Sequence, residues 1–510
     1  YEQHLTLKQL LKVGHSPTLM TRMASFRRGL QQQVFNSRLS TGAQQFVVAL
    51  LLGNSQLIDP ATRQEFSAAG VAHVLALSGL HVGFIALIIW WLLFPLDYLG
   101  LKKFRLVLTL VAIVLFAVFT GLSPSVVRAT VMIGFVFASF IFHRRAMSLN
   151  ALAIAALAIL VFTPSAIYSV GFQLSFITVL AVLLFARLPK RVESSHRWVN
   201  SITATTITSL VAMLATLALS AHYFHTVSLM SVLSNLLILP VMPVFMVLGA
   251  LFLLVTVAGL HWPALDWAID TIYKYIHWAA HSVNIIPMSH VSGVEVSTPG
   301  VIIYFIALGL LGLWLYRRKH RYLLWAALAL AVLWAHSTYL DHKTPKCGLV
   351  VFNDFTSTPI LYFDQGKCFV WTPDNEEADS ATFLRYYAGF LAHHNIHKLQ
   401  FITGDSTMRH DGILFKPPYV HLMGRRLLAV GSGKWRHMSA SQRIKLDEII
   451  VTKRFHGTVD KLRELYQFDT LIISGAIHPT TLRPLLHACD SIGIPYHNLS
   501  EQGAFIVTRK

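Results

Sequence analysis

Between about residue 81 and residue 336, long apolar runs alternate with short polar or basic breaks. An apolar helix of about 20 residues is long enough to cross the hydrocarbon core of a bilayer. The chain is 54% hydrophobic and only 13% charged, whereas soluble domains carry about a quarter charged residues. The pattern predicts a polytopic α-helical membrane protein of about nine or ten spans. The candidate spans lie at about 81–98, 105–121, 127–142, 149–163, 168–186, 200–219, 228–256, 300–316 and 321–337.

Three segments are ambiguous. Residues 43–53 are apolar but too short to span, so we expect them at the interface or packed against other helices. Residues 228–256 contain Pro240 and Pro243, which predict a broken helix. Residues 264–286 are amphipathic, with Trp and Tyr at helical spacing, and predict an interfacial helix or a tenth span. For the start of the chain and residues 345–510 to lie on the same side of the membrane, the number of crossings must be even. Either residues 264–286 therefore cross the membrane, or residues 228–256 enter and leave it on the same side.

The regions on either side of these spans differ in composition. Residues 1–75 form a polar, amphipathic segment, and residues 76–340 form the multi-span region. Residues 345–510 carry charges of both signs, as a soluble domain does. In the last region, short β-branched runs alternate with helical segments, which predicts a layered α/β domain. The chain begins Tyr-Glu-Gln without an initiator Met, and we expect it to be a fragment that lacks an N-terminal portion.

The excess of positive over negative charge lies mostly in the first 344 residues, which hold 23 Lys and Arg against 9 Asp and Glu, whereas the remainder holds 19 against 15. The positive-inside rule explains such an excess, and so does a path that attracts a polyanion. Charge alone does not separate the two. The basic loops alternate with uncharged ones, which places the basic loops in the cytoplasm and both the start of the chain and residues 345–510 outside. These loops contain Lys102–Lys103–Arg105, Arg144–Arg145, Arg187–Arg197 and Arg317–Arg321.

Four motifs within or next to the spans carry polar residues. The densest is AGVAHVLALSGLHVGFIAL, with His73, Ser78, Gly79 and His81 at the mouth of the first span. These residues are interpreted either as the lining of an entrance or as a capped helix start with two interfacial histidines. A metal pair is disfavoured, because helical ligand pairs are spaced i,i+4 and these histidines are eight apart.

The other three motifs each place one polar side chain inside an apolar segment. Arg128 in SPSVVRATVM is costly in a span unless it is paired or faces water, so it is a functional candidate, with snorkelling to the interface as the alternative. Gln173 in SVGFQLSF needs a hydrogen-bond partner, and a bond between helices is its alternative role. Asn235 in SNLLILPVMP lies beside the predicted break. Four such motifs in one membrane domain favour a lined pathway over a passive anchor.

These motifs, in this order, resemble the signature of the ComEC family of competence DNA channels, together with the preceding ALLLGNSQLID and FSAAGVAH. The resemblance covers about residues 20–335. It implies an inner (cytoplasmic) membrane channel of bacteria, through which one strand of incoming DNA passes while the other is degraded. The implied partners are single-stranded DNA, the lipid bilayer, a separate DNA receptor and a cytoplasmic ATPase motor. The two initial spans and the small β-barrel domain usual in the family are not found in this sequence.

The C-terminal region resembles the metallo-β-lactamase-like domain that many members of that family carry. FITGDSTMRHDG lies where that fold would place its zinc motif, but the HxHxDH ligand set is absent. His410, His456 and His478 remain weak ligand candidates, because a hydrolytic zinc centre needs about three protein ligands and an open position. We therefore expect a degenerate domain without enzymatic activity, metal or cofactor.

This domain also holds a basic cluster that offers phosphate contacts and one ring for stacking on a base. A solvated basic loop is an equally good interpretation. The cluster consists of Arg425, Arg426, Lys434, Trp435 and Arg436.

Three functions follow as hypotheses. The best supported is a channel that translocates single-stranded DNA into the cytoplasm during natural transformation. The alternative is a membrane-anchored, metal-dependent nuclease or hydrolase that acts on incoming DNA, against which the missing ligand motif speaks. A small-solute transporter is disfavoured, because such proteins use intramembrane carboxylates and the candidate spans contain almost none. The sequence contains no GxxxxGK[ST] motif, so an ATP-driven motor would have to be a separate protein.

Overall fold

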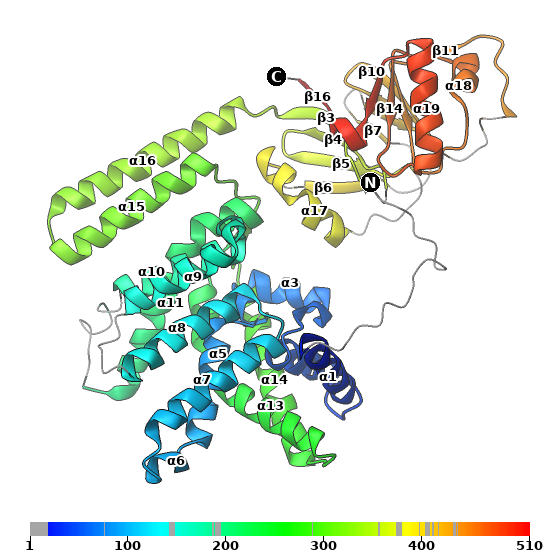
Figure 1. The fold of residues 1–510 in the computed structure, drawn as a ribbon. Coiled ribbons are helices and arrows are strands. Elements are labelled where there is room, and N and C mark those ends of the chain that lie inside the picture. Colours follow the sequence, from blue (N-terminus) through cyan, green and yellow to red (C-terminus); the bar gives the residue numbers. More distant parts are fainter. Residues whose placement is uncertain are drawn as a thin grey trace. The chain divides into compact units, whose positions relative to one another are not determined.

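The computed structural model describes residues 19–509 apart from short stretches, and these residues fall into two compact units (Figure 1). One unit comprises residues 1–291 and 311–318, and the other comprises residues 292–310 and 319–510. The stretches outside the description are 76, 142–147, 186–187, 189–194, 288, 355–356, 374–379, 397, 403–407, 411–412, 417, 432–434 and 436.

The first unit is helical. Its longer helices are α1 (Leu19–Phe35), α2 (Thr41–Leu51), α3 (Pro60–Ala68), α5 (Gly79–Leu92), α7 (Lys102–Phe119), α8 (Pro124–Ile141), α9 (Ser148–Phe162), α10 (Val170–Phe185), α11 (Arg197–Phe224), α12 (Ser231–Ile238), α13 (Met242–Val257) and α14 (Pro263–Asn284). The short elements are α4 (Ala72–Leu75), α6 (Pro95–Tyr98), the 3-10 turns Ser55–Leu57 and Pro164–Tyr168, and the paired strands β1 (Thr226–Ser228) and β2 (His290–Ser292).

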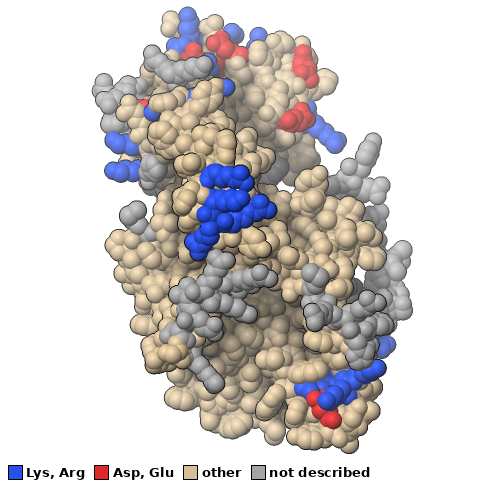
Figure 2. All heavy atoms as spheres, turned by 90° about the vertical axis from the view of Figure 1, so that its left-hand side faces the viewer, with Lys and Arg blue, Asp and Glu red and all other residues tan. Residues whose placement is uncertain are grey.

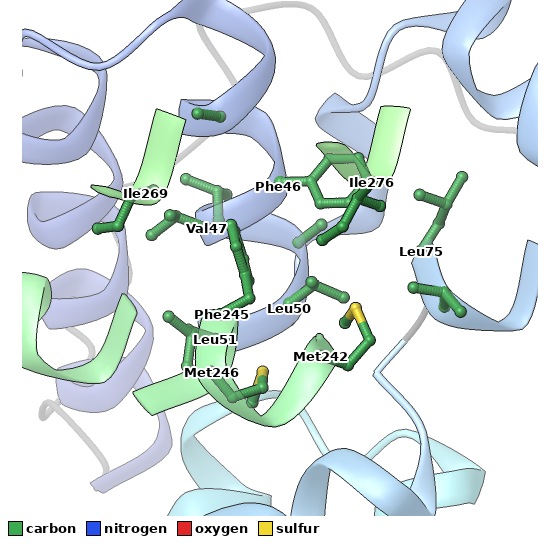
Figure 3. Close-up of a cluster of buried hydrophobic side chains, with 14 of the residues drawn as sticks. Phe46, Val47, Leu50, Leu51, Leu75, Met242, Phe245, Met246, Ile269 and Ile276 are labelled. Atoms are coloured by element: carbon green, nitrogen blue, oxygen red, sulfur yellow. The ribbon is translucent and has the colours of Figure 1, made fainter. Parts of the chain in front are cut away.

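The core of this unit forms around α2, the short apolar helix whose position the sequence left open. Phe46, Val47 and Leu50 are fully buried there against side chains of α13 and α14 (Figure 3). The prediction that this segment packs against other helices is thereby confirmed. The described part of residues 1–75 shares this core with α12–α14, so no boundary between compact units lies near residue 75.

Every predicted span contains a helix, but several of these helices are too short or too polar to cross a membrane alone. Among the described residues, α11, α15 and α16 alone are long and apolar enough to cross a membrane, and the bent pair α12–α13 would make a fourth. Helices α5, α9 and α10 have 14 to 16 residues, and at 1.5 Å per residue they reach less than the about 30 Å of a hydrocarbon core. The predicted count of nine or ten spans is therefore not confirmed.

The prediction of a broken helix at 228–256 is confirmed. Helix α12 ends at Ile238, α13 starts at Met242, and the two are bent by 49° across a break that contains Pro240. The bend fits a broken span or a re-entrant loop. Helix α14 is amphipathic: Ile269 and Ile276 are buried in the core, whereas Trp267 and Trp278 are exposed. It does not reach the hydropathy of a span, which favours the interfacial interpretation of this helix.

Helices α15 (Thr298–Arg317) and α16 (His320–Lys343) form a hairpin, in which the Ser297 hydroxyl lies 2.9 Å from Nε2 of His336. The turn between the helices carries four basic residues and no acidic one: Arg317, Arg318, Lys319 and Arg321. Figure 2 looks onto the side to which this turn points in Figure 1, and it shows a compact group of basic side chains there. This group fits the basic loop that the positive-inside rule assigns to the cytoplasm.

The second unit contains the C-terminal domain, which is α/β as predicted. One sheet has the order β16-β3-β4-β5-β6 and the other the order β15-β14-β12-β10-β9-β8-β7. Its strands are β3 (Cys347–Val351), β4 (Ile360–Asp364), β5 (Lys367–Trp371), β6 (Lys398–Ile402), β7 (Met408–His410), β8 (Ile413–Lys416), β9 (Tyr419–Leu422), β10 (Arg425–Val430), β11 (Ile444–Lys445), β12 (Glu448–Val451), β13 (Tyr466–Gln467), β14 (Thr470–Ile473), β15 (Tyr496–Asn498) and β16 (Phe505–Arg509), and its helices are α17 (Ser380–His393), α18 (Val459–Leu465), α19 (Pro479–Ile492) and α20 (Leu499–Gln502).

The two sheets pack face to face, because alternate residues of each strand point to opposite faces. Leu349 and Val351 of β3 share a core with Leu427 and Ala429 of β10, whereas Val350 of β3 faces the opposite side, toward α17. Helices α18 and α19 cover the outer face of the other sheet. The domain thus has four layers in the order helix, sheet, sheet, helix.

Candidate functional site

Helix α8 carries Arg128 into the interior of the helical unit. The residue lies in the second turn of the helix and only 5% of it is exposed, so its side chain does not snorkel to the surface. Its Nη1 atom is buried without a hydrogen-bond partner. Among the described residues, no carboxylate forms an ion pair with it. A buried cation without a counterion is costly, and this marks Arg128 as the strongest candidate of the helical unit.

Two other helices meet this guanidinium group. A Cβ atom added to Gly79, the first residue of α5, would lie 3.4 Å from Nη2 of Arg128 and 3.4 Å from Cβ of Ala129. From α10, the ring of Phe176 lies with its centroid 5.5 Å from Cζ of Arg128. The three motifs LSGLHVG, SPSVVRATVM and SVGFQLSF, which are far apart in the sequence, therefore converge on one side chain.

The start of α5 is fixed by its own side chains. Ser78 is the N-cap residue, and its backbone N–H donates to Nδ1 of His81 at 3.1 Å in a capping box. His81 is 2% exposed. The capped helix start, expected as the alternative role of Ser78 and His81, is thus present. It still leaves the backbone N–H groups of Gly79 and Leu80 without a hydrogen-bond partner among the described residues, as is usual in the first turn of a helix.

The helix start and the guanidinium group both contribute positive electrostatic potential at this place. The N-terminus of a helix carries the equivalent of about half a positive charge. The guanidinium group of Arg128 adds a full positive charge beside it, inside the protein. Two positive potentials in a poorly solvated place are unfavourable unless an anion lies between or beside them. The arrangement is therefore suited to binding an anion.

The remaining sequence candidates of this unit lie elsewhere. His73 in α4 is exposed and is not brought to Arg128 by any described contact. Gln173 is bonded at both ends of its amide group: its N–H donates to the carbonyl of Ile167 at 2.9 Å, and its oxygen accepts from the hydroxyl of Tyr223 in α11 at 2.9 Å. Gln173 thus makes the bond between helices that was its alternative role.

Asn235 belongs to a second junction, where the first motif meets the fourth. The hydroxyl of Ser234 donates to the carbonyl of Ala69 at 2.7 Å. Gly70 has a φ of +77°, and an added Cβ would lie 2.5 Å from Oγ of Ser228 and 2.6 Å from Cβ of Ser231. Next to this contact, Oδ1 of Asn235 is buried without a partner among the described residues. The junction fixes the chain that leads into α4 against the start of the bent helix pair.

The sequence did not predict Phe176, Gly70 or Ser234 as site residues, although each lies inside one of the four motifs. The signal available for the two smaller residues was the pairing of a tight Gly turn with a serine-rich helix start. No signal in the sequence pairs Phe176 with Arg128, because the contact depends on how α8 and α10 pack.

In the C-terminal domain, three of the predicted DNA-contact residues are described, and each makes contacts within the domain, while the side chains of Arg425 and Arg426 stay 44% and 41% exposed. Arg425 is paired with Glu448, and Arg426 binds Asp447 through its backbone N–H at 2.7 Å and through Nε at 3.2 Å. Trp435 is 7% exposed and stacks on Phe455 with ring centroids 5.4 Å apart. Its ring is therefore not available to a base in this conformation. Lys434 and Arg436 lie outside the described residues.

The pKa values of the two carboxyl groups in these ion pairs are shifted in opposite directions. The hydrogen bond from Arg426 lowers the pKa of Asp447. Burial raises the pKa of Glu448, and the positive charge of Arg425 offsets part of that effect. Both pairs stabilise strand β12 beside β10, which is a structural role.

The histidines considered as metal ligands do not come together. His456 is exposed, with Nδ1 2.8 Å from the carbonyl of Arg454, and His478 is the N-cap residue of α19, with Nδ1 2.7 Å from Oγ1 of Thr480. His410 lies in β7, and nothing further about its side chain is described. Within the described part of the chain, no three His, Cys, Asp or Glu residues are arranged to hold a metal ion.

Comparison with known proteins gives two family matches. Residues 50–318 match the competence protein family, and residues 349–509 match the ComEC C-terminal domain. The chain is 30% identical to ComE operon protein 3 of Bacillus subtilis (strain 168) over 160 residues, which are 31% of this chain and 20% of that protein. It is 38% identical over 139 residues to an uncharacterized protein of Aquifex aeolicus (strain VF5), covering 27% of this chain and 32% of that protein.

These matches cover less than two thirds of either relative. No solved structure matches the chain. The layered C-terminal domain is therefore assigned by family and by its own architecture, and its likeness to the metallo-β-lactamase fold stays a prediction.

Proposed function

This chain belongs to the competence protein family, and from that premise we propose that it forms a channel which passes single-stranded DNA across the cytoplasmic membrane during natural transformation. The observation that carries the proposal is Arg128, a buried and unpaired cation on which three of the motifs converge. A polyanion in a membrane needs such groups, because they replace the counterions and water that its phosphates lose.

The surrounding features support a path for a polymer more than a site for a small solute. The aromatic ring of Phe176 lies beside the guanidinium group and packs on Phe172 with ring centroids 4.3 Å apart, so it positions Arg128 instead of offering a free face to a base. The break at Pro240 is of the kind found where irregular backbone lines a cavity inside a membrane protein. In this proposal the basic turn between α15 and α16 lies in the cytoplasm, and the C-terminal domain lies outside.

For the C-terminal domain we propose a role without hydrolysis, because His456 and His478 are used for local hydrogen bonds and the expected ligand motif is missing from the sequence. The degradation of one strand and the energy for transport would then come from separate proteins. A DNA receptor and a cytoplasmic ATPase motor are the partners that this scheme requires.

The test is transformation of a naturally competent host in which the gene for this protein carries Arg128→Gln. Labelled DNA is scored both at the cell surface, where it stays sensitive to external nuclease, and in the cytoplasm. We expect surface DNA to accumulate while cytoplasmic DNA falls at least ten-fold, because the loss of a charge-assisted contact of about 1.5–3 kcal/mol corresponds to roughly that factor or more.

The matched control is Lys103→Gln, which removes an exposed positive charge at the start of α7. It lowers the net charge equally but leaves the buried site intact, so uptake should stay near the wild-type level. Normal cytoplasmic uptake in Arg128→Gln, with the variant protein present at the wild-type level, would contradict the proposed role of this residue. Normal uptake after deletion of the whole gene would remove the transport function itself.

A further inference from the structure

We propose that the N-terminus of α5 and the guanidinium group of Arg128 together form a binding site for a single phosphodiester group of the DNA backbone. The inference rests on the proposed function and gives it a specific ligand group. It makes Gly79 the residue that keeps this site open.

The donors needed for such a site are present and unused. The backbone N–H groups of Gly79 and Leu80 have no partner among the described residues, and the capping box of Ser78 and His81 holds the helix start in place. Nη1 of Arg128 is buried and unpaired, and Nη2 lies next to Gly79. A helix start with free N–H groups and a planar guanidinium fork are two of the groups that proteins use to bind phosphate oxygens.

The charge balance favours a monoanion. A phosphodiester carries one negative charge, which matches one guanidinium group, while the helix terminus adds a partial positive charge. No carboxylate among the described residues neutralises Arg128. An oxyanion would therefore remove the unfavourable meeting of two positive potentials inside the protein.

The residue at position 79 controls the space. A Cβ atom there would lie at van der Waals distance, 3.4 Å, from both Nη2 of Arg128 and Cβ of Ala129. Alanine at this position is thus compatible with the fold, and it favours a helix more than glycine does. Its methyl group, however, would stand between the helix start and the guanidinium group, where the phosphate oxygen is expected.

Phosphodiesters occur both in nucleic acids and in lipid headgroups, and the burial of the site favours a nucleic acid. Arg128 is 95% buried by helices of its own chain, and a headgroup there would have to bring two acyl chains with it. A single DNA strand presents one phosphate per nucleotide along a flexible backbone and needs no such space. Contacts to phosphate alone carry no sequence information, so the site should accept any sequence.

The test uses the purified full chain in a non-ionic detergent and a fluorescently labelled oligo-dT, with affinity measured by fluorescence anisotropy. A second probe of equal length carries uncharged methylphosphonate linkages. The variants are Gly79→Ala, Arg128→Gln and Arg128→Lys, with Lys103→Gln as the control. Thermal melting of each variant checks that the fold is retained.

We expect Gly79→Ala and Arg128→Gln to weaken binding of oligo-dT about ten-fold or more, since each removes a charge-assisted contact. Arg128→Lys keeps the charge but not the fork and should fall between these variants and the wild type. The control should bind as the wild type does. The uncharged probe should bind weakly to every variant and show no difference among them.

Wild-type affinity in a folded Gly79→Ala variant would overturn the inference. So would a result in which Arg128 affects binding of dioleoylphosphatidylglycerol in vesicles but not binding of oligo-dT, because the site would then belong to a lipid headgroup. If Gly79→Ala also takes up DNA normally while Arg128→Gln does not, the channel proposal stands and only the phosphate site falls. If neither variant changes uptake, the phosphate site and the proposed role of Arg128 both fall, and uptake after deletion of the whole gene then decides the channel proposal.

Discussion

Arg105 and Arg128 are the two arginines among the described residues of the helical unit that are almost completely buried, at 3% and 5% exposure. Arg105 in α7 is surrounded by partners: it is paired with Asp97, donates from Nε to the carbonyl of Trp90 at 2.9 Å, and lies 3.7 Å from the centroid of the Trp90 ring. Arg128 has an aromatic ring and a helix start near it, and no acceptor among the described residues.

The difference separates two uses of a buried cation. A protein can satisfy a buried charge from its own groups, in which case the charge is part of the scaffold. A charge that is left unsatisfied costs stability, and it is retained only where something else, such as a ligand, supplies the missing partner. Arg105 is of the first kind and Arg128 of the second. Four predictions test whether this distinction holds.

The largest expected effect is on stability, from Arg105→Met. The change leaves Asp97 without its partner next to an apolar segment, and breaking a buried pair by removing one member costs about 3–5 kcal/mol. Since 22% of the Asp97 side chain is exposed, we expect the lower end of that range. The measurement is the free energy of unfolding in detergent. The double variant Arg105→Met with Asp97→Leu should recover most of the loss, and an equally unstable double variant would contradict the pairing argument.

The second prediction is an increase in stability instead of a loss. Arg128→Met removes a buried charge that has no partner, so the free energy of unfolding should rise by about 1–3 kcal/mol. DNA uptake should be lost in the same variant. A clear loss of stability, similar to that of Arg105→Met, would show that Arg128 is held by the scaffold and would remove the distinction.

The third prediction extends the comparison to the C-terminal domain, where Glu448 is buried and Arg425 is its partner. Arg425→Gln leaves that carboxyl group without its counterion and should cost about 1–3 kcal/mol at neutral pH. Burial already raises the pKa of Glu448 above its usual value. The cost of ionising this group in the folded state should therefore grow as the pH rises through that raised pKa.

The pH dependence supplies the control for this prediction. Below the usual pKa of a glutamate, the carboxyl group is protonated in both the folded and the unfolded protein, and the variant should melt at the wild-type temperature. The difference between variant and wild type should appear only as the pH rises. A difference that is equally large at acid and neutral pH would show that Arg425 acts through packing instead of charge.

Much of the fold follows from hydrophobic pattern. The helices at the predicted spans, the break at Pro240 and the α/β nature of the C-terminal domain are all present. Helix bounds were less well predicted than helix positions, because an apolar run does not show where a helix begins or ends: α11 and α16 extend beyond the predicted spans, whereas α5 ends before residue 98. The first predicted span is interrupted at residues 93–94, where α5 has ended and Pro95 begins α6.

The sequence indicated the residues of the candidate site but not that they lie next to one another. Arg128 stood out because a charge in an apolar segment is costly, and Gly79 stood in a dense motif. That they touch depends on the packing of α5 against α8, which the sequence pattern does not encode. Trp435 shows the reverse case: beside basic residues it indicated a stacking platform, but its ring is buried on Phe455. Local composition does not distinguish an exposed ring from a core ring.

The smallest expected effect comes from a polar pair that the scaffold has already satisfied. Tyr223→Phe removes the hydroxyl group that donates to Gln173 at 2.9 Å while it keeps the ring. Hydrogen bonds between membrane helices contribute about 0.6 kcal/mol on average, so the free energy of unfolding should fall by about that amount. DNA uptake should stay at the wild-type level, because Gln173 is bonded within the scaffold and, in this scheme, does not face the strand. If uptake falls as strongly as in Arg128→Gln while stability changes little, Gln173 is part of the path. A hydrogen bond within the protein would then not be enough to show that a polar side chain belongs to the scaffold instead of the DNA path.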